Sequence, residues 1–409
     1  MSRAPQDWLA VLRPLVIRNQ TKIVLLVADG LGGLPIEPGG PTELEAARTP
    51  HLDRLASEGV VGLSTPVAPG LAPGSGPGHL GLFGYDPLAY EIGRGILEAL
   101  GVGMHVGPGD VAVRGNFCTL DAEGRVVDRR AGRLPTEESA RRVEKLRAGL
   151  RPPPGVEVEI RVGKDYRVAL VLRGSGLSDE VEDTDPLREG LPPRPPRARA
   201  PEGERTAQVV AALLDQVRTL LADETQGNFL LLRGFARRPA LPPFPEVTGL
   251  RAAAFALYPM YRGLAALVGM EVRDAGASLA EQLERVAAAW PDYDFFFVHH
   301  KPTDATGEDG DFAAKVAAIE ALDAALPRLL ALGPDVLAVT GDHSTPSRLR
   351  THSFHPVPLL LWAPATVRPD EVDRFGERAC ARGGLGQLRA VDLLPLLLAH
   401  AGRLQKFGA

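Results

Sequence analysis

The chain has 409 residues, of which 44% are hydrophobic and 24% are charged. This length exceeds one ordinary domain and suits two, and the composition is that of a globular protein rather than a disordered or fibrous one. The net charge of −5 comes without a basic block that could neutralise a run of phosphates, so we expect no nucleic-acid partner. Cys118 and Cys380 lie far apart in the sequence, which suggests neither a disulfide framework nor a thiolate metal site.

Export and membrane insertion are not expected. Residues 1–22 are interrupted by arginines and lack a continuous apolar core followed by a small-residue cleavage site, so they make a poor secretory signal. The apolar stretch 391–402, VDLLPLLLAHAG, is too short to span a bilayer. With only two separated cysteines, the chain fits a reducing cytoplasm, and we predict a cytoplasmic protein with no membrane partner.

The first predicted strand is residues 22–30, KIVLLVADG, a continuous apolar run of the kind found in strands buried on both faces. It ends in Asp29 and Gly30. Residues 49–59, TPHLDRLASEG, follow with apolar positions at three- and four-residue intervals, which predicts a helix. A strand followed by a helix is the first half of an α/β unit.

The middle of the chain, residues 106–245, has a different pattern. Strand-like segments at 111–121 and 156–174 alternate with helical stretches at 136–150 and 207–224, and proline-rich joints separate them. This composition predicts a smaller α+β domain inserted into the first. The first domain is then discontinuous and comprises residues 1–105 and 246–409.

The α/β pattern resumes after the insertion. Helices are predicted at 255–269, 278–290 and 311–332, and further apolar strands at 292–300, 334–343 and 356–364. The alternation predicts an α/β core with a mostly parallel sheet flanked by helices. In such sheets ligands bind beyond the carboxyl ends of the strands.

Acidic and imidazole side chains gather at these predicted strand ends. Asp29, Asp304 and the pair Asp342–His343 each follow a strand, and His352 lies a short loop further on. A lone Asp-His pair is more often a polar turn before a helix, but three strand ends that each carry a carboxylate favour a shared site. Oxygen and nitrogen donors without thiolates suit Mn²⁺, Zn²⁺ or Mg²⁺. Two such ions ~3.5–4 Å apart are the usual device for stabilising the entering and leaving oxygens in phosphoryl transfer.

A nucleophile for that chemistry is offered by Ser75, in LAPGSGPGHLGLFGYDP at 71–87. The serine stands in a Gly/Pro-framed turn just before a predicted helix, where backbone N–H groups favour an anion. The alternative for such a serine is a simple helix cap. A metal ion lowers the pKa of a bound hydroxyl, so Ser75 becomes a nucleophile only beside the metal ligands.

Taken together, these motifs resemble the archaeal-type cofactor-independent phosphoglycerate mutases of the alkaline phosphatase superfamily. The resemblance runs over most of the chain in the family's order. The motifs that carry it are VADGLGG (27–33), TPHLDRLASEG (49–59), GSGPGHLGLFGYDP (74–87), NFCTLD (116–121), DRRAGR (128–133), GSGLSDEVEDTDP (174–186), DATGEDGDF (304–312) and TGDHSTP (340–346) with His352. It implies an alkaline-phosphatase-like core with an inserted substrate-binding domain.

The resemblance also implies a set of ligands for two divalent ions, with Mn²⁺ preferred over Mg²⁺, Co²⁺ or Zn²⁺. One ion would be held by Asp29, Ser75, Asp342 and His343, and the other by Asp304, Glu308 and His352. The family normally has histidine where this chain has Glu308, and glutamate remains a competent ligand for Mn²⁺ or Mg²⁺. His355 could fill that gap, although a histidine at the entry to the next strand is the simpler interpretation. His79 matches a family histidine and is expected to support the ligands from behind.

The implied reaction is interconversion of 3-phosphoglycerate and 2-phosphoglycerate through a phosphoserine at Ser75, without 2,3-bisphosphoglycerate. The expected partner is therefore a small phosphorylated carboxylate. The sequence is compatible with a homo-oligomer and does not decide the oligomeric state. Such a ligand suits bidentate guanidinium contacts, and the candidates are Arg114, Arg129, Arg130 and Arg133, with Lys301 beside the phosphate. Solvated surface charge is the alternative for each arginine. The alternative functions are a metal-dependent phosphatase or phosphonate hydrolase of the same superfamily and, from another class, a non-catalytic phospho-ligand sensor.

Overall fold

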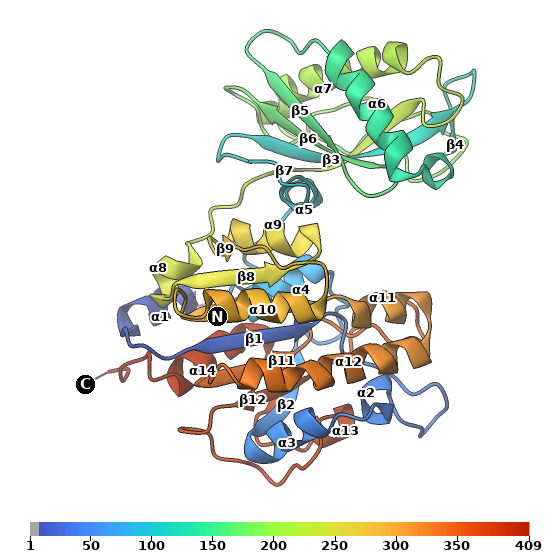
Figure 1. The fold of residues 1–409 in the computed structure, drawn as a ribbon. Coiled ribbons are helices and arrows are strands. Elements are labelled where there is room, and N and C mark those ends of the chain that lie inside the picture. The colour runs from blue at the N-terminus through green and yellow to red at the C-terminus, as the bar shows by residue number, and fades with distance from the viewer. Residues whose placement is uncertain (1–7, 409) are drawn as a thin grey trace, which may run out of the picture. The chain divides into compact units, whose positions relative to one another are not determined.

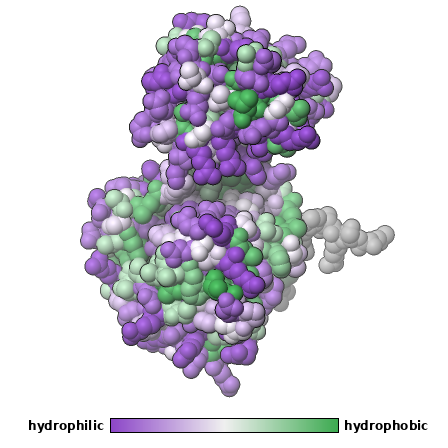
Figure 2. Space-filling model, turned by 90° about the vertical axis from the view of Figure 1, so that its right-hand side faces the viewer, coloured by the Kyte–Doolittle hydropathy of each residue, from purple (hydrophilic) through white to green (hydrophobic). Residues whose placement is uncertain are grey.

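The computed structural model describes residues 8–408 of the chain; the first seven residues of the segment assessed for an export signal lie outside this range. The chain forms two compact units (Figure 1). Unit 1 comprises Met1–Glu91 and Leu241–Ala409, and unit 2 comprises Ile92–Ala240. Hydrophilic side chains cover much of the face shown in Figure 2, interspersed with apolar ones on each unit. None of the helices in residues 8–408 is long and apolar enough to cross a membrane.

Unit 1 is built on one sheet whose strand order is β13-β2-β12-β11-β1-β10-β8-β9. Its strands are β1 (Ile23–Ala28), β2 (Val60–Thr65), β8 (Ala252–Ala256), β9 (Glu271–Val272), β10 (Phe295–His300), β11 (Val336–Thr340), β12 (Val357–Trp362) and β13 (Gly386–Arg389). The five strands from β9 to β11 run parallel, whereas β12 is antiparallel to both of its neighbours. Every residue of β1, β10 and β11 is buried, which explains their continuous apolar sequences.

Helices pack on this sheet with their apolar stripes inward. The helices of unit 1 are α1 (Trp8–Leu12), α2 (Glu43–Ala46), α3 (Pro50–Glu58), α4 (Ser75–Leu82), α8 (Phe244–Thr248), α9 (Pro259–Leu267), α10 (Leu279–Ala289), α11 (Pro302–Asp309), α12 (Phe312–Leu330), α13 (Glu377–Cys380) and α14 (Leu393–His400). In α12, Ile319, Leu322 and Leu326 recur at helical spacing and join one buried cluster with Val24 and Leu26 of β1. Asp311 caps this helix by accepting a hydrogen bond from the Ala314 amide, at 2.9 Å.

The predicted strands at 22–30, 292–300, 334–343 and 356–364 are all present, and so are the predicted helices at 49–59, 278–290 and 311–332. The helix predicted at 255–269 begins later, at Pro259, because residues 252–256 form strand β8. The sequence AAAFA there has none of the β-branched residues that favour a strand. Proline at the first helical position then fixes where α9 starts.

Unit 2 has its own antiparallel sheet and its own core. Its strands are β3 (Val111–Leu120), β4 (Val126–Asp128), β5 (Glu157–Val162), β6 (Arg167–Arg173) and β7 (Phe229–Arg237), with β3 between β6 and β7. Its helices are α5 (Arg94–Gly101), α6 (Thr136–Gly149) and α7 (Glu204–Leu220). Apolar residues of α6 and α7, including Val143 and Leu213, pack with β3, β6 and β7.

The sequence-based domain boundaries lie later in the chain than those between the two units. The sequence predicts residues 92–105 in the first domain, whereas α5 packs on β3 and β7 and belongs to unit 2. Gly95 permits this packing, since a Cβ atom there would lie 2.3 Å from the Ala112 carbonyl oxygen. Residues 92–105 contain no proline, so no proline-rich joint marks the boundary before this helix.

Candidate active site

The predicted acidic residues of unit 1 meet at one edge of its sheet. Strand β1 lies between β10 and β11 and pairs with both in parallel, so the three carboxyl ends are adjacent. Asp29 follows β1, Asp342 and His343 follow β11 after one glycine, and Asp304 lies in the first turn of α11, just after β10. All four side chains are buried, with at most 1% exposed.

Two groups of metal-ligand atoms form there, each with its atoms within 4.8 Å of one another. The first group is Asp29, Asp342 and His343. Nε2 of His343 lies 3.3 Å from Oδ1 of Asp29 and 3.2 Å from Oδ2 of Asp342. The same Nε2 atom lies 3.2 Å from Oγ of Ser75, which places the serine hydroxyl at this group.

The second group is Asp304, His343 and His352, so the two groups share His343 and lie side by side. The rings of His343 and His352 stack with their centroids 3.6 Å apart. Glu308, the predicted third ligand, lies at the margin: its Oε1 atom is 3.6 Å from Nε2 of His352, and 53% of its side chain is exposed. The neighbouring imidazole of His352 lowers the pKa of Glu308, so its carboxylate is charged at neutral pH.

The first group suits a divalent cation because its carboxylates are buried and poorly satisfied. Within the described chain, both carboxylate oxygens of Asp29 and Oδ2 of Asp342 are buried without a hydrogen bond of acceptable geometry. Burial, together with the charge of Asp29, raises the pKa of Asp342 to about 7. Burial acts the same way on Asp29, but the adjacent imidazoles of His299 and His343 hold its pKa well below the usual value. A divalent cation would neutralise both carboxylates.

Ser75 is the first residue of α4, and the start of this helix approaches the β11 loop closely. A Cβ atom at Gly78 would lie 2.2 Å from the Asp342 carbonyl oxygen, so only glycine allows the approach. One turn along α4, Nδ1 of His79 lies 2.9 Å from the Ser75 carbonyl oxygen and 3.1 Å from Oδ2 of Asp342. Burial lowers the pKa of His79 to about 4, so the imidazole is neutral and braces the helix start against Asp342.

Lys301 also belongs to this site. Its Nζ atom lies 3.1 Å from Oδ2 of Asp29 and pairs with Asp304, so one ammonium group contacts a carboxylate of each metal-ligand group. Although burial acts to lower the pKa of Lys301, the two carboxylates raise it, and the side chain stays charged. His355, the alternative ligand, instead contacts Oγ of Ser353 through Nδ1, at 3.0 Å.

Sequence reasoning missed several residues that hold these ligands. The hydroxyl of Thr345 donates to Oδ1 of Asp304, at 2.5 Å, and therefore accepts from Nδ1–H of His343, at 2.9 Å. This leaves the Nε2 lone pair of His343 facing the first group. Lys315 of α12 is fully buried and donates to the carbonyl groups of Gly30, Gly32 and Thr345. Thr345 stands in the TGDHSTP motif, so its place could have been inferred; the helical spacing around Lys315 gave no such indication.

The four candidate arginines lie in unit 2, apart in sequence from the metal ligands. The guanidinium of Arg129 makes a two-pronged ion pair with the buried Asp185, at 2.9 and 2.7 Å. Arg114 in β3 contacts Asn116 and lies 3.7 Å from Glu98. Arg130 and Arg133 are exposed on the turn after β4, where Arg133 has a φ of 56°. The first two guanidiniums are thus engaged within unit 2, and the last two face solvent.

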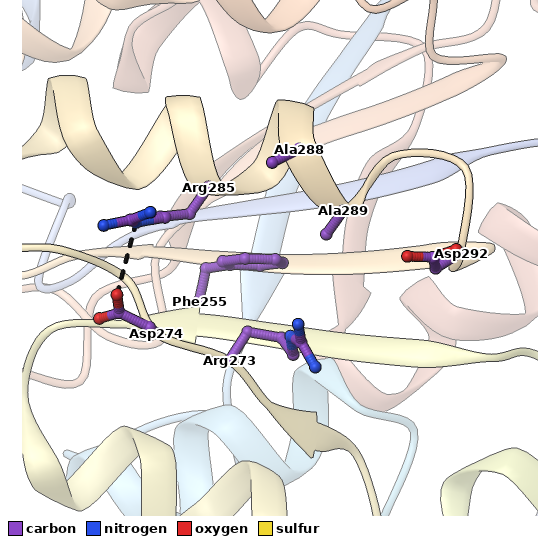
Figure 3. A pocket seen from close by; sticks show the side chains of 7 residues that line it. All are labelled: Phe255, Arg273, Asp274, Arg285, Ala288, Ala289 and Asp292. Atoms are coloured by element: carbon purple, nitrogen blue, oxygen red, sulfur yellow. Dashed lines mark ion pairs between the residues drawn. The ribbon is translucent and has the colours of Figure 1, made fainter.

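A separate shallow pocket on unit 1 contains none of the predicted site residues (Figure 3). It is lined by Phe255, Arg273, Asp274, Arg285, Ala288, Ala289 and Asp292. Its charges are matched locally, since Arg285 pairs with Asp274 and Arg273 pairs with Glu271. The pocket therefore has both of its arginines engaged in ion pairs and lies apart from the metal-ligand groups.

The parallel sheet, the buried carboxylate and imidazole groups at its carboxyl edge and the adjacent serine define an α/β protein with a candidate metal-dependent active site. Residues 56–226 match the family model described as 2,3-bisphosphoglycerate-independent phosphoglycerate mutase. A relative from Thermus thermophilus, named as a probable enzyme of that kind, is 56% identical over 98% of this chain and 100% of its own length. A relative from Thermosipho africanus with the same name is 51% identical over 98% of this chain and 100% of its own length.

Solved structures agree with these relatives. The cofactor-independent phosphoglycerate mutase from Thermoplasma acidophilum is 33% identical, with a TM-score of 0.72 over 93% of this chain and all of its own. A protein from Pyrococcus horikoshii is 31% identical, with a TM-score of 0.80 over 95% of this chain and all of its own. The chain belongs to the 2,3-bisphosphoglycerate-independent phosphoglycerate mutase family.

Proposed function

We propose that the chain interconverts 3-phosphoglycerate and 2-phosphoglycerate through a phosphoserine at Ser75, in a site that binds two divalent ions. The observation that carries the proposal is the position of Oγ of Ser75, 3.2 Å from Nε2 of the histidine that both metal-ligand groups share. The names of the relatives supply the substrate. Their independence of 2,3-bisphosphoglycerate agrees with an internal serine as the carrier of the phosphoryl group.

The residues present fit a pair of hard or borderline cations. Asp29, Ser75, Asp342 and His343 would hold one ion, and Asp304, Glu308 and His352 the other. Bound ions would lower the pKa of the serine hydroxyl and neutralise charge on the phosphoryl oxygens. The donors are oxygen and imidazole nitrogen, which suits Mn²⁺ in particular, with Mg²⁺, Co²⁺ and Zn²⁺ as alternatives.

The chain's own residues supply the nucleophile and its surroundings. Oγ of Ser75 forms a bond to phosphorus as the bond from phosphorus to the glycerate oxygen breaks; that oxygen keeps the electron pair, and the proton of the serine hydroxyl ends on it. The phosphoryl group then returns from Oγ to the other glycerate hydroxyl. Lys301, which contacts both metal-ligand groups, adds a positive charge beside the transferring group. Burial of the serine, at 8% exposed, limits the access of water to the phosphoserine.

Substrate recognition in this proposal uses guanidinium groups of unit 2. Arg130 and Arg133 are the stronger candidates because their side chains are exposed, whereas Arg129 is paired with Asp185 and Arg114 with Asn116. Two guanidiniums suffice for a ligand that carries one phosphate and one carboxylate. Cytoplasmic location and oligomeric state stay predictions from the sequence.

The test is to incubate the metal-loaded protein with 3-phosphoglycerate, without 2,3-bisphosphoglycerate, and to follow both 2-phosphoglycerate and free phosphate. We expect 2-phosphoglycerate with little free phosphate, and phosphate on Ser75 in rapidly quenched protein by mass spectrometry. Free phosphate as the main product would favour the phosphatase alternative. If neither 2-phosphoglycerate nor free phosphate forms, the remaining alternative is a non-catalytic phospho-ligand sensor.

Replacing the nucleophile provides the matched experiment. Ser75→Ala should lower turnover by at least about 1,000-fold while both metal-binding steps persist, because the other ligands hold the ions without the hydroxyl. Ser139→Ala is the control, since Ser139 is a fully buried serine of unit 2 outside the site. If the activity of Ser75→Ala is close to that of Ser139→Ala, the phosphoserine mechanism is wrong.

A further inference from the structure

A tyrosine that the sequence did not single out contacts the nucleophile. Tyr261 lies in α9 and is fully buried, with 0% of its surface exposed. Its hydroxyl oxygen lies 3.4 Å from Oγ of Ser75, with the phenol as donor. Of the hydroxyl groups in residues 8–408, this is the one recorded in contact with the serine oxygen.

The neighbours of the Tyr261 hydroxyl determine the direction of its hydrogen bond. Nζ of Lys301 lies 3.1 Å from the phenol oxygen, and an ammonium group can only donate. The phenol oxygen therefore accepts from Lys301, which leaves its single proton available for the hydrogen bond to Oγ of Ser75.

Ring packing holds this donor in place. The Tyr261 ring stacks on the ring of His299, with centroids 3.7 Å apart and an interplanar angle of 26°. The ring of His79 lies 4.9 Å away. Both histidines are buried, with 1% and 0% exposed, so the phenol cannot swing away from the serine without displacing the core of unit 1. A donor fixed before the reaction needs no reorganisation during it.

We propose that Tyr261 is a catalytic residue: its hydroxyl donates a hydrogen bond to Oγ of Ser75 and stabilises the negative charge on that oxygen. The inference rests on the proposed phosphoserine mechanism. When the phosphoryl group leaves the serine, the bond from phosphorus to Oγ breaks and its electron pair goes to Oγ. A bond from phosphorus to the glycerate oxygen forms, and the proton of that glycerate hydroxyl ends on Oγ. The serine hydroxyl is restored, and no further reactant is required.

The test compares Tyr261→Phe with Tyr85→Phe. Tyr85 is also a fully buried tyrosine of unit 1, and its hydroxyl donates to the Pro242 carbonyl group, at 2.7 Å, away from the site. Tyr261→Phe keeps the ring and removes only the donor. We expect its kcat to fall about 100-fold, with KM and both metal-binding steps unchanged, as for a lost donor to a developing oxyanion. Tyr85→Phe should keep the wild-type kcat.

Rapid quenching adds a readout that loss of structure would not give. Because attack by Oγ and departure from it pass through the same kind of transition state, Tyr261→Phe should slow the formation and the loss of phosphoserine alike, to the extent that kcat falls and with metal binding unchanged. A kcat for Tyr261→Phe equal to that of Tyr85→Phe overturns the proposal, and so does a fall in kcat that merely follows lost metal binding. If wild-type protein forms no phosphoserine at all, the proposed function itself fails, which is a distinguishable result.

Discussion

Glu308 is the residue at which this chain departs from the histidine of its family pattern. It stands one helical turn after Asp304 on α11, with its carboxylate 3.6 Å from Nε2 of His352. An anionic oxygen in place of imidazole favours Mn²⁺ or Mg²⁺ over Zn²⁺. Glu308→Ala should therefore weaken one metal-binding step about tenfold or more and spare the other, and Glu308→His should shift the preference towards Zn²⁺ or Co²⁺.

Titration calorimetry on the wild type and both variants is the measurement. Half-exposure of the Glu308 side chain allows the carboxylate to turn towards Asp304 or away into solvent. Two unchanged binding steps in all three proteins would show that it points away and would remove it from the metal site.

The sequence indicates the candidate ligands that follow strands more clearly than the residues that contact them. Asp29, Asp342 and His343 could be predicted because a polar side chain after a buried apolar run stands out, and adjacent parallel strands bring such residues together. Tyr261 and His299 could not, because each lies in an apolar helix or strand where one polar ring resembles an ordinary core residue. Their proximity to Ser75 depends on strand order and helix packing, which no local pattern records.

Glu377 predicts a pH dependence of stability outside the site. It is held by the Thr42 hydroxyl and, at 2.8 Å, by the Gly33 amide. Burial raises its pKa to about 7 despite these hydrogen bonds. A carboxyl group with a higher pKa in the folded state favours folding while it is protonated. Its contribution is therefore complete below the ordinary glutamate pKa of about 4.3 and is lost as the pH rises through 7.

The free energy of unfolding should therefore fall between pH 5 and pH 8 by on the order of 3 kcal/mol through this group. Glu377→Gln removes the titration, so the difference in stability between wild type and variant should change by that amount over the same interval. Glu37→Gln, at an exposed position, serves as the control and should follow the wild type. Parallel pH curves for wild type and Glu377→Gln would refute the assignment.

Among the elements, α3 depends on a residue from another helix. Its N-cap residue, Thr49, makes no side-chain cap hydrogen bond. Instead, the buried Asp323 of α12 accepts from the amide groups of His51, at 3.3 Å, and Leu52, at 2.7 Å. Asp323→Ala leaves these amides unsatisfied and should lower the free energy of unfolding by about 2 kcal/mol. Asp323→Asn keeps one acceptor oxygen, so its free energy of unfolding should fall by less than that of Asp323→Ala.

Urea unfolding followed by tryptophan fluorescence measures this effect. Equal stability of Asp323→Ala and wild type would show that water replaces the carboxylate at the helix start. Asp323→Ala and Asp323→Asn should both retain metal binding, because Asp323 contacts none of the metal ligands.

Helices and buried strands were predictable as elements because their apolar periodicity is local. Strands β2, β8 and β13 were not: β2 contains glycine and polar residues, β8 is rich in alanine, and β13 is a short edge strand with exposed residues. The antiparallel direction of β12 likewise has no local signature, since a strand buried on both faces looks the same in either direction.

At the scale of the whole molecule, all metal-ligand candidates belong to unit 1, so metal binding should stabilise that unit selectively. A ligand that binds only the folded state raises stability by about 2.7 kcal/mol at one hundred times its Kd. The chain carries a reporter in each unit: Cys380 is buried in unit 1 and Cys118 in unit 2, both as free thiols.

Thiol labelling during heating, read by mass spectrometry, should therefore separate the units. Chelation should lower the temperature at which Cys380 reacts and leave that of Cys118 unchanged. Equal shifts for both thiols would show that the two units unfold as one.

Strand β1 lies in the middle of the large sheet, yet residue 23 pairs with residues 295 and 336. A ribosome adding about 5–20 residues per second takes roughly 15–60 s to make the chain between these partners. Unit 2, which is continuous in sequence, emerges entire during that interval and can fold first. Meanwhile β1, whose six residues are all buried in the finished protein, stays unpaired in the nascent chain. Strand β1, which precedes Asp29, is therefore synthesised early and pairs with its neighbours late. During this interval its apolar side chains are exposed, so β1 is a segment that a chaperone would bind in the nascent chain.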